Sequence, residues 1–208
     1  MIVRYASVIT WPAFAILSLA MLCACSSNSP APHYYTLSTS TANTSDASSP
    51  LASAANYSVG VATATLPDAI DRPQLVVRIN ANRVDMLEDQ RWADDLKREI
   101  PRVVAENLAQ RLGSSRVAAY PQHAAENTDY TVLLDVQRFD SEPNEAATLD
   151  ILWTLRRTSN VTPRTTHFIW REPVNGIGFD ALVAAHSRAL AKLSDQIAQA
   201  IRADAAHR

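Results

Sequence analysis

The chain has 208 residues, with 19 lysines and arginines against 21 aspartates and glutamates, so its formal net charge is only −2. A charge this close to zero, without a long run of one sign, argues against nucleic acid as a partner. The four glycines are scattered along the chain, and this excludes the glycine-rich loops that bind phosphate.

The N-terminus has the features of a bacterial lipoprotein signal. Arg4 precedes an apolar run that ends in small residues, which is the order found in export signals. Within "LSLAMLCACSS", Leu22 and Ala24 lie three residues and one residue before Cys25. This spacing matches the Leu-x-Ala/Gly-Cys motif whose cysteine takes up a diacylglycerol. The residues before Cys23 stand in the wrong order. We therefore predict that residues 1–24 are removed and that Cys25 is lipidated.

Two other interpretations of this segment remain open, an uncleaved transmembrane anchor and a plain secretion signal. An anchor needs about 20 predominantly apolar residues, and Pro12 with several hydroxyl side chains weakens the run. A mature lipoprotein carries three acyl chains, enough for lasting attachment. Ser26, rather than aspartate, follows the lipidated cysteine. In a bacterium with two membranes, this predicts the periplasmic face of the outer membrane.

The composition divides the mature chain into a tether, one domain and a tail. Residues 25–32 form the lipidated cysteine and its tether, and residues 33–204 form the single domain. The domain begins with "HYYTL", whose aromatic and β-branched residues favour a strand. Residues 38–56 are rich in Ser, Thr and Ala and are expected to form a mobile loop, because they cannot bury enough apolar surface. Residues 205–208 are the C-terminal tail.

Strands and then a helix are predicted in the first half of the domain. "YSVGVATATLP" and "PQLVVRIN" favour strands, and the second is expected to turn at Asn80–Asn82 and continue through "RVDML". A helix is predicted over 90–113, with Gly113 as its C-cap. We expect it to be kinked rather than broken at Pro101. Its apolar stripe consists of Trp92, Leu96, Ile100, Val103, Val104, Leu108 and Leu112.

The second half of the domain predicts an antiparallel meander followed by a helix. "DYTVLLDVQRF", "ATLDILWTLRR" and "RTTHFIWRE" alternate apolar and polar residues, so each strand has one buried face. The segment 179–203 is strongly amphipathic, and its inward stripe includes His186. The predicted fold class is therefore α+β, with a mixed, mostly antiparallel sheet and two long helices packed on one face.

The sequence carries none of the motifs of covalent, acid–base or metal catalysis. There is no "GxSxG" and no "HExxH". His186 and Ser187 are adjacent, but neighbours in a helix point in different directions and cannot form a catalytic hydrogen bond. Asp94 and Asp95 are explained by the favourable interaction of acids with a helix N-terminus. We expect no enzymatic activity, no cofactor and no metal.

The order of several segments resembles a known family. The lipobox at Cys25, "YYTL", "LPDAIDRPQLVVRINANRVDMLEDQRWADDL" and "VVAENLAQRLG" follow one another as in the ABC-type transport auxiliary lipoproteins, the PqiC-like family. The resemblance covers the mature domain from about Tyr34 onward, and residues 66–113 carry most of it. It implies a non-enzymatic outer-membrane lipoprotein that works with MCE-domain proteins and inner-membrane components to move lipid between membranes.

The sequence alone leaves two further functions open, and it suggests one contact site. The protein could instead be an outer-membrane assembly or secretin-pilot factor, or a periplasmic binder of a small apolar ligand. Asp71 and Arg72, in the exposed turn "DAIDRPQ", are our candidates for partner binding. A salt bridge within the turn is the simpler explanation for these two residues. A homo-oligomer is expected, because MCE proteins are symmetric rings and closed symmetry favours matching subunit numbers.

Overall fold

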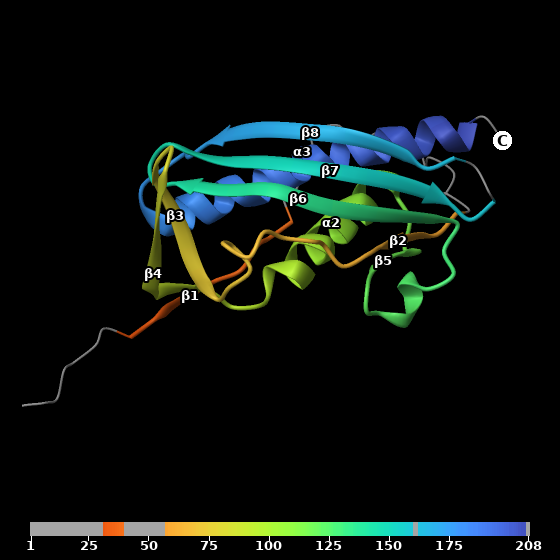
Figure 1. Cartoon of the computed structure of the whole chain (residues 1–208). Helices are drawn as coiled ribbons and strands as arrows, with labels where there is room; N and C mark the ends of the chain where they lie inside the picture. Colours follow the sequence, from red (N-terminus) through yellow and green to blue (C-terminus); the bar gives the residue numbers. More distant parts are fainter. Residues whose placement is uncertain (1–30, 40–56, 160–161, 207–208) are drawn as a thin grey trace, which may run out of the picture. The chain divides into compact units, whose positions relative to one another are not determined.

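The computed structural model describes residues 31–39, 57–159 and 162–206, and the chain from Pro32 onward forms one compact unit. Cys25 and most of the predicted loop 38–56 lie outside the described residues. The α+β prediction is confirmed, because a mixed eight-stranded sheet carries two long helices on one face (Figure 1). Neither of these helices, nor any other in the described ranges, is long and apolar enough to cross a membrane.

Three long antiparallel strands form one half of the sheet, and they follow one another in a meander as the sequence predicts. They are β6 (Tyr130–Glu142), β7 (Ala146–Arg157) and, at the edge of the sheet, β8 (Arg164–Pro173). Side chains alternate between a buried face and an outer face, except at a β-bulge between Val136 and Arg138. The buried face is made by Tyr130, Val132, Leu134, Val136, Leu149, Ile151, Trp153 and Leu155.

The remaining strands assemble on the other edge of β6. Its start pairs in parallel with β2 (Val59–Val61), which also pairs with β5 (Val117–Ala119). Its end meets β3 (Gln74–Asn80) through the single parallel pair Val77–Ser141. β3 forms a hairpin with β4 (Arg83–Trp92), and β1 (His33–Tyr35) pairs in parallel with the end of β4. The N-terminal segment is therefore a strand, as predicted, at an edge of the sheet.

The first long helix, α2, runs from Leu96 to Leu112 and starts later than the predicted residue 90. Residues 90–92 instead belong to β4, and Asp95 is the N-cap, because its side chain accepts a hydrogen bond from the Lys97 amide. The prediction of the helix start was wrong because Trp92 lies four residues before Leu96, in phase with the helical stripe. Gly113 ends the helix in a left-handed conformation, as predicted.

The carbonyl that Pro101 leaves without a hydrogen bond inside α2 has a partner outside the helix. Pro101 lacks the amide hydrogen that would bond the carbonyl of Lys97, four residues earlier. That carbonyl accepts a hydrogen bond from the backbone amide of Ala64 at 3.2 Å instead. The helix therefore continues through Pro101 with the Lys97 carbonyl satisfied. The same hydrogen bond holds the segment that follows β2 against α2.

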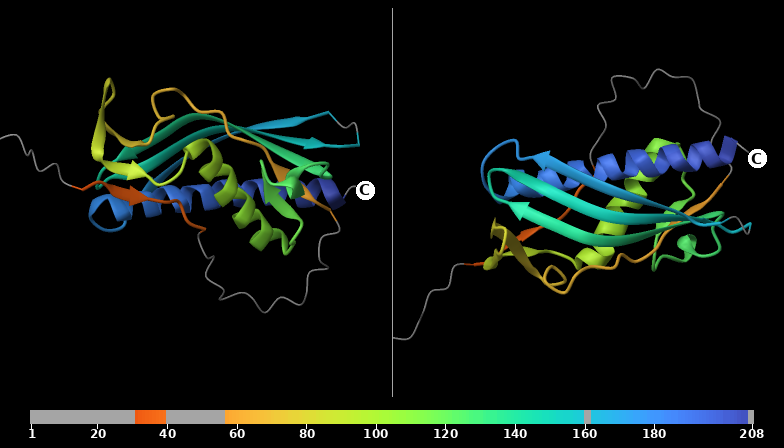
Figure 2. Two further views of the ribbon diagram at one scale, coloured as in Figure 1. Left: turned by 90° about the horizontal axis from the view of Figure 1, so that it is seen from below. Right: turned by 45° about the horizontal axis from the view of Figure 1, so that its top comes forward.

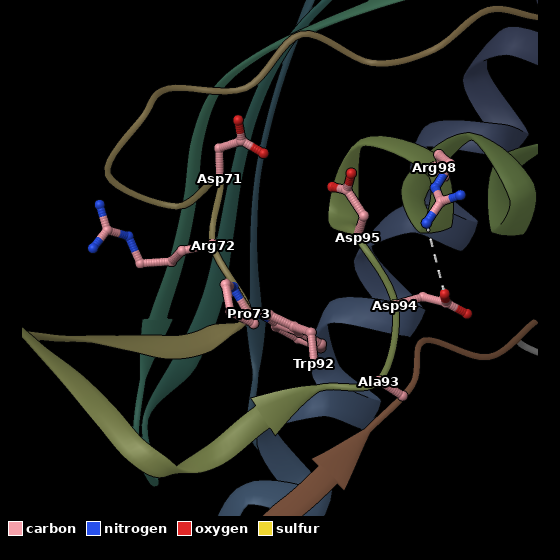
Figure 3. Close-up of a pocket in the computed structure, with 8 residues that line it drawn as sticks. All are labelled: Asp71, Arg72, Pro73, Trp92, Ala93, Asp94, Asp95 and Arg98. Carbon is pink, nitrogen blue, oxygen red and sulfur yellow. Dashed lines mark ion pairs between the residues drawn. The ribbon is translucent and has the colours of Figure 1, made fainter.

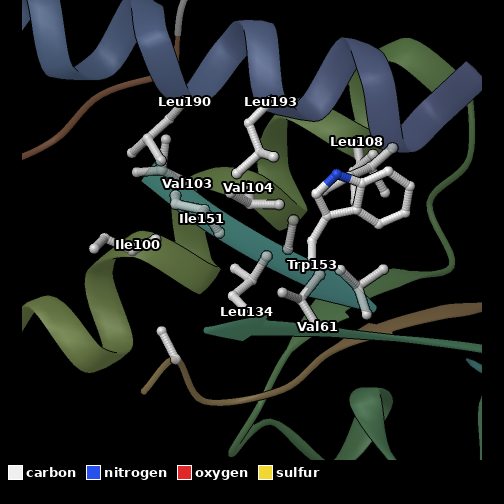
Figure 4. Close-up of a cluster of buried hydrophobic side chains, with 14 of the residues drawn as sticks. Val61, Ile100, Val103, Val104, Leu108, Leu134, Ile151, Trp153, Leu190 and Leu193 are labelled. Carbon is white, nitrogen blue, oxygen red and sulfur yellow. The ribbon is translucent and has the colours of Figure 1, made fainter. Parts of the chain in front are cut away.

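The second long helix, α3, spans Gly178–Ala206 and covers the buried face of the meander together with α2 (Figure 2). Side chains from both helices and from the sheet meet in one core. Figure 4 shows Leu108 of α2 and Leu193 of α3 beside the indole of Trp153. All three are at most 1% exposed. The predicted inward stripe of this helix is confirmed, including the fully buried His186.

Candidate functional site

A groove of about 410 Å³ lies where the turn before β3 faces the start of α2 (Figure 3). It includes both residues that the sequence suggested for partner binding, Asp71 and Arg72. The residues that line it are Asp71, Arg72, Pro73, Trp92, Ala93, Asp94, Asp95 and Arg98.

Backbone hydrogen bonds fix the walls of the groove. The carbonyl of Pro67 accepts hydrogen bonds from the amides of Ile70 and Asp71, which closes the turn. The amide of Trp92 donates to the carbonyl of Pro73 at 2.8 Å and joins this turn to the end of β4. The amide of Ala93 donates to the carbonyl of Tyr35 and holds the end of β1 beside the groove. The groove is therefore a built feature of three segments that are distant in sequence.

Acidic and basic groups alternate around the opening. Asp71 forms an ion pair with Lys97 of α2, and the hydrogen bond that the Lys97 ammonium donates to the Asp71 carboxylate raises the pKa of that lysine. Asp94 lies 4.0 Å from Arg98, and both side chains are largely exposed. The carboxylate of Asp95 is used by the helix N-cap. Asp94 and Arg98 are therefore the charged groups most available to a partner, because their mutual attraction is weak at this distance and exposure.

The structure separates the two residues that the sequence placed in one contact. Both are half-buried rather than exposed. Asp71 bridges to the helix rather than within its turn, whereas the side chain of Arg72 points away from Asp95 and Arg98 in Figure 3. The Arg72 guanidinium donates to the Asp68 carbonyl at 3.0 Å and to the sulfur of Met86 on β4 at 2.8 Å. Only Asp71 therefore belongs to the side of the groove that faces α2.

Glu99 and Arg102 of α2 hold the backbone of the segment that follows β1, and we call this contact the clamp. The sequence did not predict it. Glu99 is 2% exposed, and its carboxylate accepts hydrogen bonds from the Leu37 amide, the Thr36 hydroxyl and Arg102. Arg102 also donates to the Leu37 carbonyl at 2.9 Å. The amide and the carbonyl of Leu37 are thus both hydrogen-bonded by side chains of α2, next to the groove. Only the proximity of the two segments in space reveals this contact, since 62 residues separate Leu37 from Glu99.

Ion pairs around Asp140 hold the β3–β4 hairpin against the outer face of β6. Asp140 of β6 is 7% exposed and forms ion pairs with Arg78 of β3 at 2.7 Å and with Arg138 at 2.6 Å. Burial of the Asp140 carboxyl raises its pKa, but the hydrogen bonds from Arg78 and Arg138 outweigh burial and hold the pKa below its ordinary value of 3.8. These ion pairs therefore stabilise the hairpin wherever the carboxyl is ionised.

We expect Asp140→Asn to lower the free energy of unfolding by about 1–3 kcal/mol at neutral pH, the range for hydrogen bonds to a charged group. Because the pKa of Asp140 is lowered by folding, its contribution is present above about pH 3.8 and is lost as the pH falls through the folded-state pKa. Urea unfolding between neutral and acidic pH measures this, with Asp85→Asn, at an exposed ion pair with Arg83, as control. Equal losses of unfolding free energy for Asp140→Asn and Asp85→Asn would contradict the stabilising role of the Asp140 ion pairs.

His186 and Ser187, which are adjacent in sequence, each take part in contacts within the core rather than with each other. The His186 ring stacks on Phe139 at 4.0 Å, and its Nε2 lies 2.8 Å from the Ser141 hydroxyl. Complete burial lowers the pKa of His186 to about 3. The Ser187 hydroxyl donates to the Val183 carbonyl and accepts from the Ser38 amide. Across the described ranges, no group of three His, Cys, Asp or Glu side chains could hold a metal ion.

Comparison with protein families gives one match, and it covers most of the chain. The model of the family described as "ABC-type transport auxiliary lipoprotein component" matches residues 35–198. The match begins at β1 and ends within α3, so it includes the groove and the clamp. The resemblance found from the sequence is therefore confirmed. No curated protein sequence matches the chain.

Several solved structures match the chain, and two of them show the shared fold well. One is the crystal structure of an uncharacterized protein with 18% sequence identity, in which the match covers 83% of this chain and 99% of that chain, with a TM-score of 0.64. The other is protein XCC0632 from Xanthomonas campestris, with 19% identity, coverage of 80% and 92%, and a TM-score of 0.63. At such low identity these likenesses concern the fold alone.

Proposed function

Because the chain belongs to the family of ABC-type transport auxiliary lipoprotein components, we propose that it is a non-enzymatic docking subunit of an intermembrane lipid transport system. Cys25 attaches it to the periplasmic face of the outer membrane, and the domain holds the end of an MCE-type lipid conduit. The family match supports an auxiliary role in ABC-type transport. The outer membrane, the MCE partner and the lipid cargo are the parts that this proposal adds.

The groove beside the N-terminus of α2 is the observation that carries the docking role. Its walls are fixed by backbone hydrogen bonds, and Asp94 and Arg98 present opposite charges at its opening. Charges at a rim steer association and select partners. Asp71 supports this arrangement by holding Lys97. Several copies of the domain would surround one conduit, because a symmetric ring offers several equivalent sites.

Reversing charge at the groove should weaken docking. We expect Asp94→Lys to reduce binding of the MCE-domain protein about tenfold, which corresponds to about 1.4 kcal/mol, because it places two cations together at the opening. Crosslinking in cells followed by purification of the lipoprotein measures the recovered partner. Glu126→Lys is the matched control, because Glu126 is an exposed acid beside η3 (His123–Ala125), outside the groove.

Two outcomes would contradict this function. Equal recovery of the MCE-domain protein with Asp94→Lys and with Glu126→Lys would remove the groove from the contact. Recovery of a β-barrel assembly or a secretin, with no MCE-domain protein at any level, would favour the alternative of an assembly or secretin-pilot factor.

A further inference from the structure

Exposed apolar side chains gather at one end of the domain. In Figures 1 and 2 the start of β1, the β3–β4 hairpin and the β8–α3 connection lie at this end, and the C-terminus of α3 lies at the other. Eight large hydrophobic side chains are exposed in the described residues, and five of them belong to these three segments. We call these five the apolar end: Tyr34, Ile79, Val84, Met86 and Ile177.

The hairpin contributes three of these five side chains and has a defined orientation. Val84 pairs with Arg78 and Met86 pairs with Val76, so Val84 and Met86 share one face of the ribbon with an arginine. The Arg72 guanidinium lies against Met86 on that face. The ion pair between Arg78 and Asp140 fixes the hairpin to the sheet, so its apolar side chains keep their position relative to the domain.

The described fold leaves these side chains uncovered. Ile177 is 92% exposed in the connection between β8 and α3, and Tyr34 is 62% exposed on the edge strand β1. Exposed apolar residues scattered singly need no explanation, but a group at one end of a domain marks an interaction surface. Arg72, which lies against Met86 and bonds the Asp68 carbonyl rather than a carboxylate, adds attraction to anionic groups. Apolar side chains with adjacent basic residues suit the headgroup region of a phospholipid bilayer.

The length of the tether brings this surface within reach of the membrane. If Cys25 is lipidated, as the proposed function requires, His33 at the start of β1 lies only eight residues after the anchor. A fully extended chain of that length spans at most about 28 Å. Along β4, the distance from Gln90, which pairs with His33, to Arg83 at the hairpin turn is about 23 Å at the rise of a strand. The tip of the hairpin can therefore touch a bilayer that lies up to about 23 Å from β1, which is most of the range that the tether allows.

From these observations we infer that the apolar end rests on the phospholipid surface in which Cys25 is anchored. This inference rests on the lipid attachment in the proposed function and adds an orientation to it. The hairpin, β1 and the β8–α3 connection face the bilayer, and the end of β7 and the C-terminus of α3 face away. The groove, next to the end of β1, then lies close to the membrane, where lipid leaving a conduit has to arrive.

Single cysteines labelled with an environment-sensitive fluorophore test this orientation. The full-length lipidated protein carries Val84→Cys or Ile177→Cys, and Ser159→Cys at the exposed β7–β8 connection is the matched control. The vesicles contain phosphatidylethanolamine and phosphatidylglycerol, with a fraction of nitroxide-labelled lipid as quencher. We expect labels at 84 and 177 to shift to shorter emission wavelengths and to be quenched on vesicles, whereas the label at 159 keeps its emission in water.

Flotation of the same samples separates the failure of the inference from the failure of the proposed function. Protein that floats with vesicles while labels at 84 and 177 behave like the label at 159 overturns the orientation and leaves the anchor intact. Protein that does not float contradicts anchoring through Cys25, and the orientation falls with it. A shift at 84 and 177 in detergent alone that grows with protein concentration assigns the surface to a second copy and overturns the inference.

Discussion

Leu193→Ala in α3 and Leu108→Ala in α2 should each lower the free energy of unfolding by about 2–5 kcal/mol. Both side chains are completely buried, and Figure 4 places one on each helix, next to Trp153 of the sheet. Truncation to alanine leaves a cavity that the surrounding rigid elements cannot refill. Urea denaturation of the purified domain, with each variant compared with the natural chain, measures the loss.

Leu152→Ala is the matched control for this prediction. Leu152 alternates with Ile151 and Trp153 on β7, so its half-buried side chain lies on the outer face of the same strand. We expect a distinctly smaller loss there, because less apolar surface leaves water on folding. Near-zero losses for both Leu108→Ala and Leu193→Ala would contradict the packing of two helices on one face of the sheet.

Cys25→Ser should abolish attachment to membranes, whereas Cys23→Ser should leave it unchanged. A serine cannot accept the diacylglycerol, and the Leu-x-Ala-Cys spacing is present only at Cys25. Fractionation of cells into membrane and soluble proteins, together with the mass of the mature N-terminus, measures both effects. Opposite behaviour of the two variants would mean that the lipidated cysteine was assigned wrongly.

Periodicity predicted the central elements of the fold because their burial is one-sided. β6 and β7 alternate between buried and outer side chains along most of their length, β8 buries only Phe168, and the stripe of α3 from Phe179 to Ile201 spans about six turns. The first helix was predicted with the wrong start, because Trp92 at the end of β4 continues the phase of α2 by coincidence. The cap at Asp95 was the better signal for its N-terminus.

The features that could not be predicted from the sequence depend on contacts between residues that are distant in the chain. The order of the strands depends on β6 pairing with two different strands along one edge, β2 at its start and β3 at its end. The contact of Glu99 with Leu37 and the ion pair of Asp71 with Lys97 likewise depend on how distant segments meet. The turn that contains Asp71 could be located from its residue types, but the groove that it helps to form could not.

Site-specific photocrosslinking from the groove tests the docking function most directly. A photoreactive residue replaces Asp94 at the opening in the full-length lipoprotein, and a second variant carries it at Glu126 outside the groove. After illumination of intact cells, the crosslinked partners are identified by mass spectrometry. We predict an MCE-domain protein crosslinked from position 94 and not from position 126. Crosslinks from position 94 only to other outer-membrane proteins, with no MCE-domain protein, would contradict the proposed function.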